Sequence, residues 1–318
     1  MNFVEELRSI INGSLLGDAC IRVDKEKYFT FKYTAKDKKF LENLKKFFES
    51  YKIRCWITVD NPGVHSLSFY INTCHYKQFM ELRGKWYIKE NGKTSKMLPD
   101  DLEITPTTLL YWYLGDGCLV RRKNDENRVP TLCLATNCFS KKDVEILLEK
   151  LRKRKLNFYA TESASGFNKG EKAGYALYSK VQDGTPLRFF QTIGINCPKE
   201  ILDCSTGRKG IDHRERFFRD KWPTEDDWVK ILSNTNIGSI LRRRRLGMGL
   251  TQKQLGERVG IRRENIRDVE LGKRHFCVNN FKKVLVAAHL TPSYLLGKFV
   301  PAAKKLIKVA EITKSMRI

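Results

Sequence analysis

Two carboxylates occupy matching places in two similar stretches of the chain, residues 13–20 and 111–118. Each stretch is an apolar run that ends in Gly-Asp, followed by a small residue and a Cys. We predict that each Asp, Asp18 or Asp116, stands at the end of an apolar helix and just before a strand. A duplicated unit of this kind places two carboxylates symmetrically, which is the layout of a two-metal or shared-metal nuclease site.

The predicted elements repeat in the same order in both halves of residues 1–203. An offset of 98 residues aligns Asp18 with Asp116 and Cys20 with Cys118. Hydrophobic periodicity predicts a helix, two strands, a helix, two strands and a helix in each half, an αββαββα pattern. The predicted strands are 19–24, 28–34, 53–60 and 64–72 in the first half, with 117–122 and 130–136 opening the second.

The charge of the chain indicates a polyanionic partner, and nucleic acid is the expected one. The formal net charge is +24 and the isoelectric point is near 9.7. A lysine-rich surface that serves solubility alone is the alternative.

No run of about 18 apolar residues is present, so we expect no membrane span. The nine cysteines are scattered without a CxxC pair, which argues against a disulfide framework or a zinc site. The start resembles no secretion signal, and we expect an intracellular protein of the cytoplasm or an organelle matrix.

Alternating strands give the first half a face rich in hydrogen-bonding and cationic side chains. Such a face suits base edges and phosphates in a major groove, although an ordinary solvated sheet face is an open alternative. The candidate DNA-binding residues of the two halves are Arg22, Thr30, Lys32, Arg54, Trp56, Ser68, Tyr70, Asn72 and Lys180.

The composition changes after residue 236. Residues 237–318 hold 19 Lys/Arg and 5 Asp/Glu, against 41 and 31 in the first 236. Predicted helices at 237–250, 252–259 and 262–271 make a helix-turn-helix around Gly260. This segment resembles the phage-repressor-like helix-turn-helix family, whose second motif helix enters the major groove. The resemblance makes Arg262, Arg263, Asn265 and Arg267 candidate DNA-facing residues and Gln252 a candidate phosphate contact. A small helical bundle that binds protein is the alternative.

The runs 11–19 and 109–117 resemble the LAGLIDADG motif of homing endonucleases. Ile104-Thr105-Pro106 and Lys96-Met97-Leu98-Pro99 extend the resemblance to the two-motif, single-chain, intron-encoded branch, over about residues 3–200. The resemblance implies an α+β fold in which two pseudo-symmetric αββαββα halves with saddle-shaped antiparallel sheets pack through their motif helices. With the C-terminal all-α helix-turn-helix domain, the expected divisions are 1–104, 105–203, a basic linker 204–236, and 237–318 with a basic tail.

The glycines and carboxylates of the motifs support this resemblance physically. Gly13 and Gly17 lie four apart on one helix face, where, together with Gly115, they allow a neighbouring backbone to come close. Two Asp at the negative ends of adjacent helices repel each other, and a bound cation resolves this. We expect Mg²⁺ held by Asp18 and Asp116 with the adjoining Ala19 and Gly117; Mn²⁺ is expected to substitute, and Ca²⁺ to bind without cleavage.

Two departures from the family pattern stand out. Tyr111 replaces the first Gly of the second motif, which predicts asymmetric or looser helix packing there. Ala19 replaces the final Gly of the first motif, where only a small residue is needed. The family places a Lys near each active centre, and Lys96 matches the first; Asp203 stands where the second is expected, with Lys180 or Lys199 as substitutes.

The sequence therefore predicts a monomeric, Mg²⁺-dependent endonuclease, with Asp18, Asp116 and Lys96 as catalytic residues, that cuts a long, largely non-palindromic double-stranded DNA site. Two alternatives stay open: an RNA maturase that binds intron RNA, and a DNA-binding regulator on an inactive nuclease scaffold. The C-terminal domain would lengthen the site or repress the protein's own gene.

Overall fold

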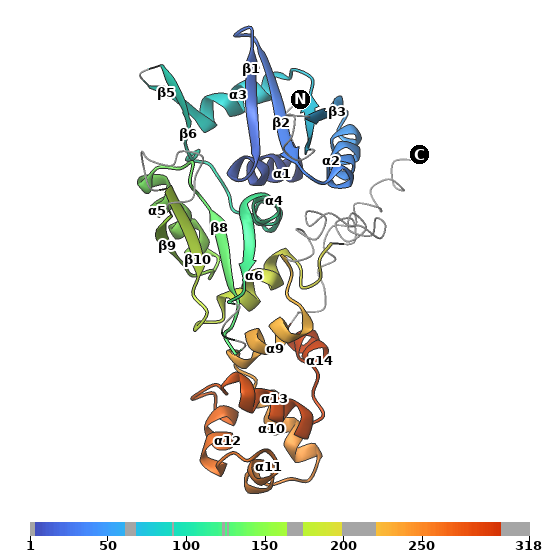
Figure 1. Cartoon of the computed structure of the whole chain (residues 1–318), viewed down its shortest axis with the longest axis vertical. Helices are drawn as coiled ribbons and strands as arrows, with labels where there is room; N and C mark the ends of the chain where they lie inside the picture. The colour runs from blue at the N-terminus through green and yellow to red at the C-terminus, as the bar shows by residue number, and fades with distance from the viewer. Residues whose placement is uncertain are drawn as a thin grey trace.

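The computed structural model describes residues 4–299, except 61–67, 91, 123, 124, 126, 164–173 and 199–220. Three parts follow one another along the longest axis of the molecule (Figure 1): an N-terminal α/β half, a second α/β half, and a helical C-terminal part. The two α/β halves meet through one helix from each, α1 (Glu5–Leu16) and α4 (Pro106–Asp116). In the described part of the chain, no helix is long and apolar enough to cross a membrane.

The first half contains a four-stranded antiparallel sheet in the order β1-β2-β4-β3. Its elements after α1 are β1 (Ala19–Asp24), β2 (Tyr28–Ala35), α2 (Lys38–Ser50), β3 (Cys55–Asp60), β4 (Ser68–Thr73) and α3 (Lys77–Trp86). A hairpin of β5 (Tyr87–Glu90) and β6 (Lys93–Lys96), which the periodicity did not predict, follows α3. The predicted αββαββα order is confirmed in this half.

The second half repeats the same order and the same sheet topology, β7-β8-β10-β9. Its elements after α4 are β7 (Gly117–Val120), β8 (Thr131–Ala135), α5 (Lys141–Lys153), β9 (Phe158–Ser163), β10 (Gly174–Ser179) and α6 (Thr185–Ile193). Start signals fix two of its helices: the Thr105 hydroxyl caps α4, and Ser140 forms a capping box with Asp143 at α5. The internal repeat of the sequence is therefore a structural repeat.

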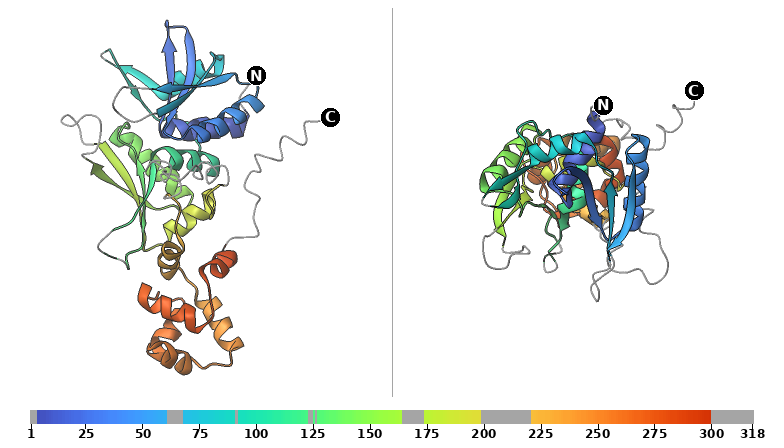
Figure 2. Two further views of the ribbon diagram at one scale, coloured as in Figure 1. Left: turned by 45° about the vertical axis from the view of Figure 1, so that its right-hand side comes forward. Right: turned by 90° about the horizontal axis from the view of Figure 1, so that it is seen from above.

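Each sheet has one face packed on helices and one face turned away from them (Figure 2). In the first half, Phe31, Tyr33 and Ile71 are buried on the inner face, as alternation predicts for the first two. Lys32 pairs with Asn72 on the opposite face, and Asn72 pairs with Trp56. Lys32, Asn72 and Trp56 of the predicted outward set thus lie on one surface.

The stretch 204–236, predicted to be a basic linker, contains a helix ahead of the C-terminal helices. Within the stretch 204–236, residues 204–220 lie outside the described residues, but Trp222 is buried and a helix, α9 (Glu225–Ser233), follows it. Helix α9 contacts α6 of the second half as well as the helices that follow. These are α10 (Gly238–Gly247), α11 (Gln252–Val259), α12 (Arg263–Glu270), α13 (Val278–Ala287) and α14 (Pro292–Phe299). The basic tail after Phe299 lies outside the described residues.

Candidate active site at the paired motif helices

Helices α1 and α4 pack backbone to backbone at their C-terminal ends. A Cβ on Gly17 would lie 3.2 Å from the Gly115 Cα, and one on Gly115 would lie 3.1 Å from the Asp18 N. Gly13 is closer still, since its Cβ would lie 2.4 Å from the Thr108 O. The three glycines predicted to allow helix contact therefore do so. A Cβ on Gly13 would also lie 2.9 Å from the Tyr111 Cβ, so this end is asymmetric but not loose.

The two carboxylates consequently lie at adjoining helix ends. Burial and the charge of Asp18 raise the pKa of Asp116 to about 7. Desolvation by the surrounding protein also raises the pKa of Asp18, although this residue is partly accessible to solvent. The positive charges of Lys221, Lys96 and Lys36 act in the opposite direction. Without a cation, the site therefore disfavours two full negative charges.

Lys96 binds the C-terminal end of the first motif helix. Its Nζ donates to the carbonyl oxygens of Leu15, Gly17 and Ala19 at 2.7, 3.1 and 2.9 Å. The hairpin β5–β6 positions it, because Lys96 is the last residue of β6 and its neighbour Met97 donates from N to the Trp86 O. A cation there compensates the negative end of the helix dipole next to Asp18.

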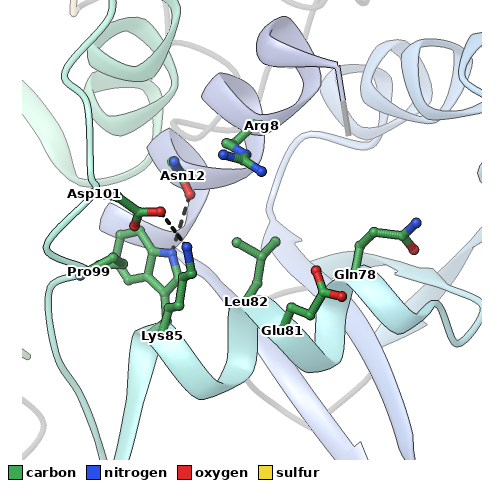
Figure 3. A pocket seen from close by; sticks show the side chains of 9 residues that line it. Arg8, Asn12, Gln78, Glu81, Leu82, Lys85, Pro99 and Asp101 are labelled. Carbon is green, nitrogen blue, oxygen red and sulfur yellow. Dashed lines mark hydrogen bonds and ion pairs between the residues drawn. The ribbon is translucent and has the colours of Figure 1, made fainter. Parts of the chain in front are cut away.

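Polar contacts join the end of α3 to α1 and to the chain after β6 (Figure 3). The Trp86 Nε1 donates to the Asn12 Oδ1 at 3.3 Å, and Lys85 pairs with Asp101. These residues line a pocket between α1, α3 and the chain after β6. Because this pocket is lined by side chains that pack the first half together, we assign it a structural role.

Lys221 binds the end of the second motif helix in the same way. Its Nζ donates to the carbonyl oxygens of Tyr113, Leu114 and Gly115 at 3.0, 2.6 and 3.0 Å. Lys221 is 1% exposed, and burial lowers its pKa to about 7 against the attraction of Asp18 and Asp116. Its main chain is fixed from both sides, since the Lys221 O accepts from the Tyr113 OH and the adjacent Trp222 O accepts from Arg121.

Lys221 is the residue that the sequence did not reveal. It falls in the stretch predicted to be a linker, and the second basic role was sought in Lys180 or Lys199. Lys180 instead follows β10 and lines a groove with Tyr159 and Arg128, and Lys199 lies outside the described residues. The available signal was Trp222 directly after Lys221, because an isolated Trp in a polar stretch indicates a buried anchor.

The arrangement fits a divalent cation. In the described part of the chain, no group of three or more His, Cys, Asp or Glu gathers around a possible metal position. The carboxylates that would bind a cation at the helix ends are Asp18 and Asp116. The remaining ligands of a hard cation would be main-chain oxygens, water and phosphate. The pKa of each carboxyl group is raised because burial and mutual repulsion disfavour the ionised form, and a bound cation would offset both effects.

Comparison with known proteins agrees with this geometry. Residues 8–183, more than half of the chain, match the model of the LAGLIDADG DNA endonuclease family. The chain belongs to this family. Residues 241–295 match a helix-turn-helix model. The family supports DNA endonuclease activity in general terms, which agrees with the paired carboxylates.

Three curated proteins illustrate the similarity. An uncharacterized protein of Methanocaldococcus jannaschii is 32% identical over 157 residues, 48% of this chain and 57% of that protein. A probable intron-encoded endonuclease 1 of Wickerhamomyces canadensis is 30% identical over 146 residues, 44% of this chain and 61% of that protein. The cytochrome b mRNA maturase bI2 of Saccharomyces cerevisiae is 32% identical over 111 residues, 34% of this chain and 23% of the maturase. The match therefore spans less than two thirds of each relative.

Two solved structures are similar to part of the chain. The homing endonuclease I-WcaI bound to its DNA recognition sequence has a TM-score of 0.48 and 23% identity, covering 61% of this chain and 82% of that one. The complex of I-DmoI with DNA and Ca has a TM-score of 0.40 and 11% identity, covering 62% and 96%.

The first LAGLIDADG half presents most of its predicted DNA-binding side chains on one sheet face. Arg22 pairs with Thr30, Thr34 with Tyr70, and Ser68 lies two residues before Tyr70 on β4. Lys32 stands over the Tyr70 ring, with its Nζ 3.8 Å from the ring centroid. Arg54 lies just before β3 and is exposed, and its backbone N–H donates to the Tyr76 OH.

In the helix-turn-helix region, some of the residues predicted to face DNA are exposed and others are engaged in contacts within the protein. Arg262 and Arg263 are exposed at the start of α12, and Arg267 is paired with Asp268. The Asn265 Oδ1 accepts from Arg274 at 2.7 Å.

The Gln252 side chain is half-buried, and its Nε2 donates to the Glu270 Oε2 at 2.8 Å. Glu270 also forms a buried ion pair with Arg245, whose Nε lies 2.6 Å from the Glu270 Oε1. Arg245, the last of four consecutive arginines, lies in the core. In the described structure, the contacts of Gln252 are therefore those of a residue that orders this buried pair.

Proposed function

We propose that this chain is a site-specific endonuclease that cuts both strands of a long, largely non-palindromic DNA target with a divalent cation. The observation that carries the proposal is the paired arrangement of Asp18 with Lys96 and Asp116 with Lys221 at two adjoining helix ends. A duplicated centre of this kind suits a double-strand cut, with each carboxylate associated mainly with one strand.

The residues of the site have distinct roles in this proposal. Asp18 and Asp116, with the adjoining Ala19 and Gly117, would hold Mg²⁺; Mn²⁺ would substitute for it, and Ca²⁺ would bind without cleavage. When bound, the cation would supply an activated water and would stabilise the leaving oxygen of an in-line displacement. Lys96 and Lys221 place an amino group at the end of each motif helix, beside the phosphate that becomes more negative in the transition state. The Lys221 group, with a pKa of about 7, is only partly charged at neutral pH.

Cleavage of a plasmid library with randomised inserts tests this proposal. The wild type, Asp18→Asn and Asp116→Asn are compared with Mg²⁺ and with EDTA. We expect the wild type with Mg²⁺ to cut one long sequence, and each variant to nick it or leave it intact. Specific DNA capture with no cutting by any form would instead support a regulator on an inactive scaffold.

We further propose that the C-terminal module extends the target on the side of the second half. Figure 1 shows the helical part beyond the second half, away from the first. The junction is built from fixed contacts: Arg121 pairs with the buried Asp227 of α9 at 2.8 Å, and the Trp228 ring packs on Phe190 with centroids 5.5 Å apart. A module held this way binds DNA at one offset from the second half-site.

Footprinting on the cleavage site measures this extension. Protection is expected to continue beyond the second half-site only, and to shrink there in Arg262→Ala and Arg263→Ala with cleavage retained. Protection that ends at the second half-site would contradict the extension and would indicate that the module binds a separate DNA sequence.

An RNA maturase is the second candidate, favoured by the match to the yeast mRNA maturase. The same basic surface would then bind a folded intron. Competition at fixed salt between the duplex target and the host intron RNA separates the two, because non-specific affinity for both depends steeply on ionic strength. Preference for the RNA would support the maturase.

A further inference from the structure

Two cysteines face each other across the first strand pair of the second half. Cys118 of β7 lies directly opposite Cys133 of β8 in the antiparallel register, and the two thiols are hydrogen-bonded to each other. Both are free thiols, of which Cys118 is half-buried and Cys133 is buried. Among the strand pairings of the described residues, no other position places one cysteine opposite another. The equivalent position of the first half pairs Cys20 with Lys32.

The register places the two sulfur atoms where a disulfide can close. Opposed residues of an antiparallel pair have Cα atoms about 4.5–5.5 Å apart, and a disulfide joins Cα atoms about 4.4–6.8 Å apart. Closure therefore does not require β7 to separate from β8. It does draw the two Cβ atoms together, from about 4.5–5.5 Å to about 3.8 Å, which is a shift on the order of 1 Å.

A shift of Cys118 reaches the second carboxylate, because only Gly117 separates it from Asp116. The chain before it has little freedom to absorb the shift. A Cβ on Gly117 would lie 2.1 Å from the Tyr113 Cδ2, and Lys221 binds the carbonyl oxygens at the end of α4. A displacement on the order of 1 Å at a catalytic group lowers a rate about 100-fold. The bond would therefore act on the centre that contains Asp116 and leave the centre of the first half in place.

We propose that Cys118 and Cys133 form a reversible disulfide that switches off the centre containing Asp116, an inference that rests on the proposed endonuclease function. The oxidant is hydrogen peroxide. The Cys118 sulfur attacks the O–O bond, which breaks, so that Cys118 becomes a sulfenic acid and a water leaves. The Cys133 sulfur then attacks the Cys118 sulfur, the S–O bond breaks, and a second water leaves. The two thiols lose two electrons to the peroxide, and a reducing dithiol reverses the change.

Oxidation of the full chain with hydrogen peroxide tests the bond without any cleavage assay. After free thiols are alkylated, peptide mapping by mass spectrometry should show the peptide with Cys118 joined to the peptide with Cys133, and dithiothreitol should separate them. Cys133→Ser should give no joined peptide. Cys20→Ser is the matched control, because Cys20 stands at the equivalent place of the first half, and it should still form the joined peptide. Absence of the joined peptide from the oxidised wild type would overturn the inference, whether or not the protein cuts DNA.

Cleavage of the selected target on a supercoiled plasmid tests the switch. With Mg²⁺, the oxidised wild type should cut one strand about 100-fold more slowly than the reduced protein, so that nicked circles accumulate until dithiothreitol is added. Cys133→Ser treated in the same way should show no nicking that dithiothreitol reverses. An oxidised wild type that carries the bond and cuts both strands at the reduced rate would overturn the switch alone. A reduced wild type that cuts no specific DNA would overturn the proposed function and with it the switch, while peptide mapping would still decide whether the bond forms.

Discussion

The two carboxylates of the site hold their protons with different strength, and this difference has a measurable consequence. Asp116 is partly buried beside Asp18, and its pKa is raised to about 7, well above the value near 4 of an unfolded chain. A group that binds its proton more tightly in the folded state stabilises that state only while it stays protonated. The metal-free protein should therefore lose stability as the pH rises from about 4 to 7.

Urea unfolding in EDTA checks this expectation. Between pH 5 and pH 8, we expect the wild type to lose on the order of 1–2 kcal/mol more than Asp116→Asn, whose amide does not titrate. Saturating Mg²⁺ should reverse the difference above pH 7, because the cation binds the ionised wild-type carboxylates. Parallel pH profiles for the two proteins in EDTA would contradict the assigned burial of Asp116.

The two lysines predict a strand-specific defect. Lys96→Met or Lys221→Met should lower the cleavage rate of one strand by about 100-fold, so that nicked DNA accumulates, while affinity with Ca²⁺ stays nearly unchanged. Lys36→Met is the matched control, since Lys36 is exposed and also acts on Asp18 through its charge. Equal loss on both strands in a single variant would argue against one lysine per centre.

The sequence predicted three of the four residues of this constellation, because these three lie inside the two repeated halves. Asp18 and Asp116 are aligned by the 98-residue offset, and Lys96 lies just before a recognisable segment. Lys221 lies beyond the second half, after a stretch with no periodic pattern, and only tertiary packing brings it to α4. Local spacing contains no information about such a contact.

At the scale of elements, the two motif helices owe their separation to missing side chains. Gly13, Gly17 and Gly115 leave the backbones in contact, and Gly117 leaves room for the Tyr113 ring, whose Cδ2 would lie 2.1 Å from an added Cβ. The first motif has Ala19 at the position equivalent to Gly117. The sequence suggested that any small residue is sufficient at this position. This holds in the first half, where Ala19 is accommodated, but in the second half the Tyr113 ring leaves no space for a Cβ at position 117.

This packing predicts opposite outcomes for three glycine substitutions. Gly13→Ala and Gly117→Ala should each lower the free energy of unfolding by about 1–3 kcal/mol, because the added methyl group meets backbone or a buried ring. Gly84→Ala should raise it by about 0.5–1 kcal/mol, because Gly84 lies within helix α3 with open space around it. Chemical denaturation with Mg²⁺ absent measures all three. A destabilised Gly84→Ala would contradict the described surroundings of α3.

The strands and most helices followed from periodicity, whereas the hairpin β5–β6 did not. Tyr87–Lys96 has few apolar residues, so no alternation marks it as a sheet. Its conformation depends on tertiary contacts, such as the Tyr87 OH that accepts from the Ile21 N and the Arg83 guanidinium that donates to the Ile21 O. The element that positions Lys96 was therefore invisible to local pattern.

At the scale of the whole molecule, a stretch predicted to be a linker contains a rigid junction. Helix α9 is fixed to the second half by Arg121–Asp227 and by Trp228 on Phe190, and α9 also packs on α13 and α14. Its basic surroundings gave the sequence the composition of a linker, but the buried aromatic anchors make it part of the core. The distance between the second half-site and the C-terminal module is thus set by protein packing rather than by a flexible chain.

The last prediction follows from that rigidity. Inserting about five base pairs, half a turn of DNA, between the second half-site and the module's binding site should lower wild-type affinity to that of Arg262→Ala. Arg121→Gln removes the ion pair yet keeps the Asp227 cap of α9, and it should tolerate the insertion better while binding the original site more weakly. Arg122→Gln removes an equal charge from the neighbouring exposed residue and should keep the wild-type dependence on spacing. If the insertion left the wild-type affinity unchanged, the connection between the second half and the module would be flexible, because only a flexible connection allows the module to reach both faces of the duplex.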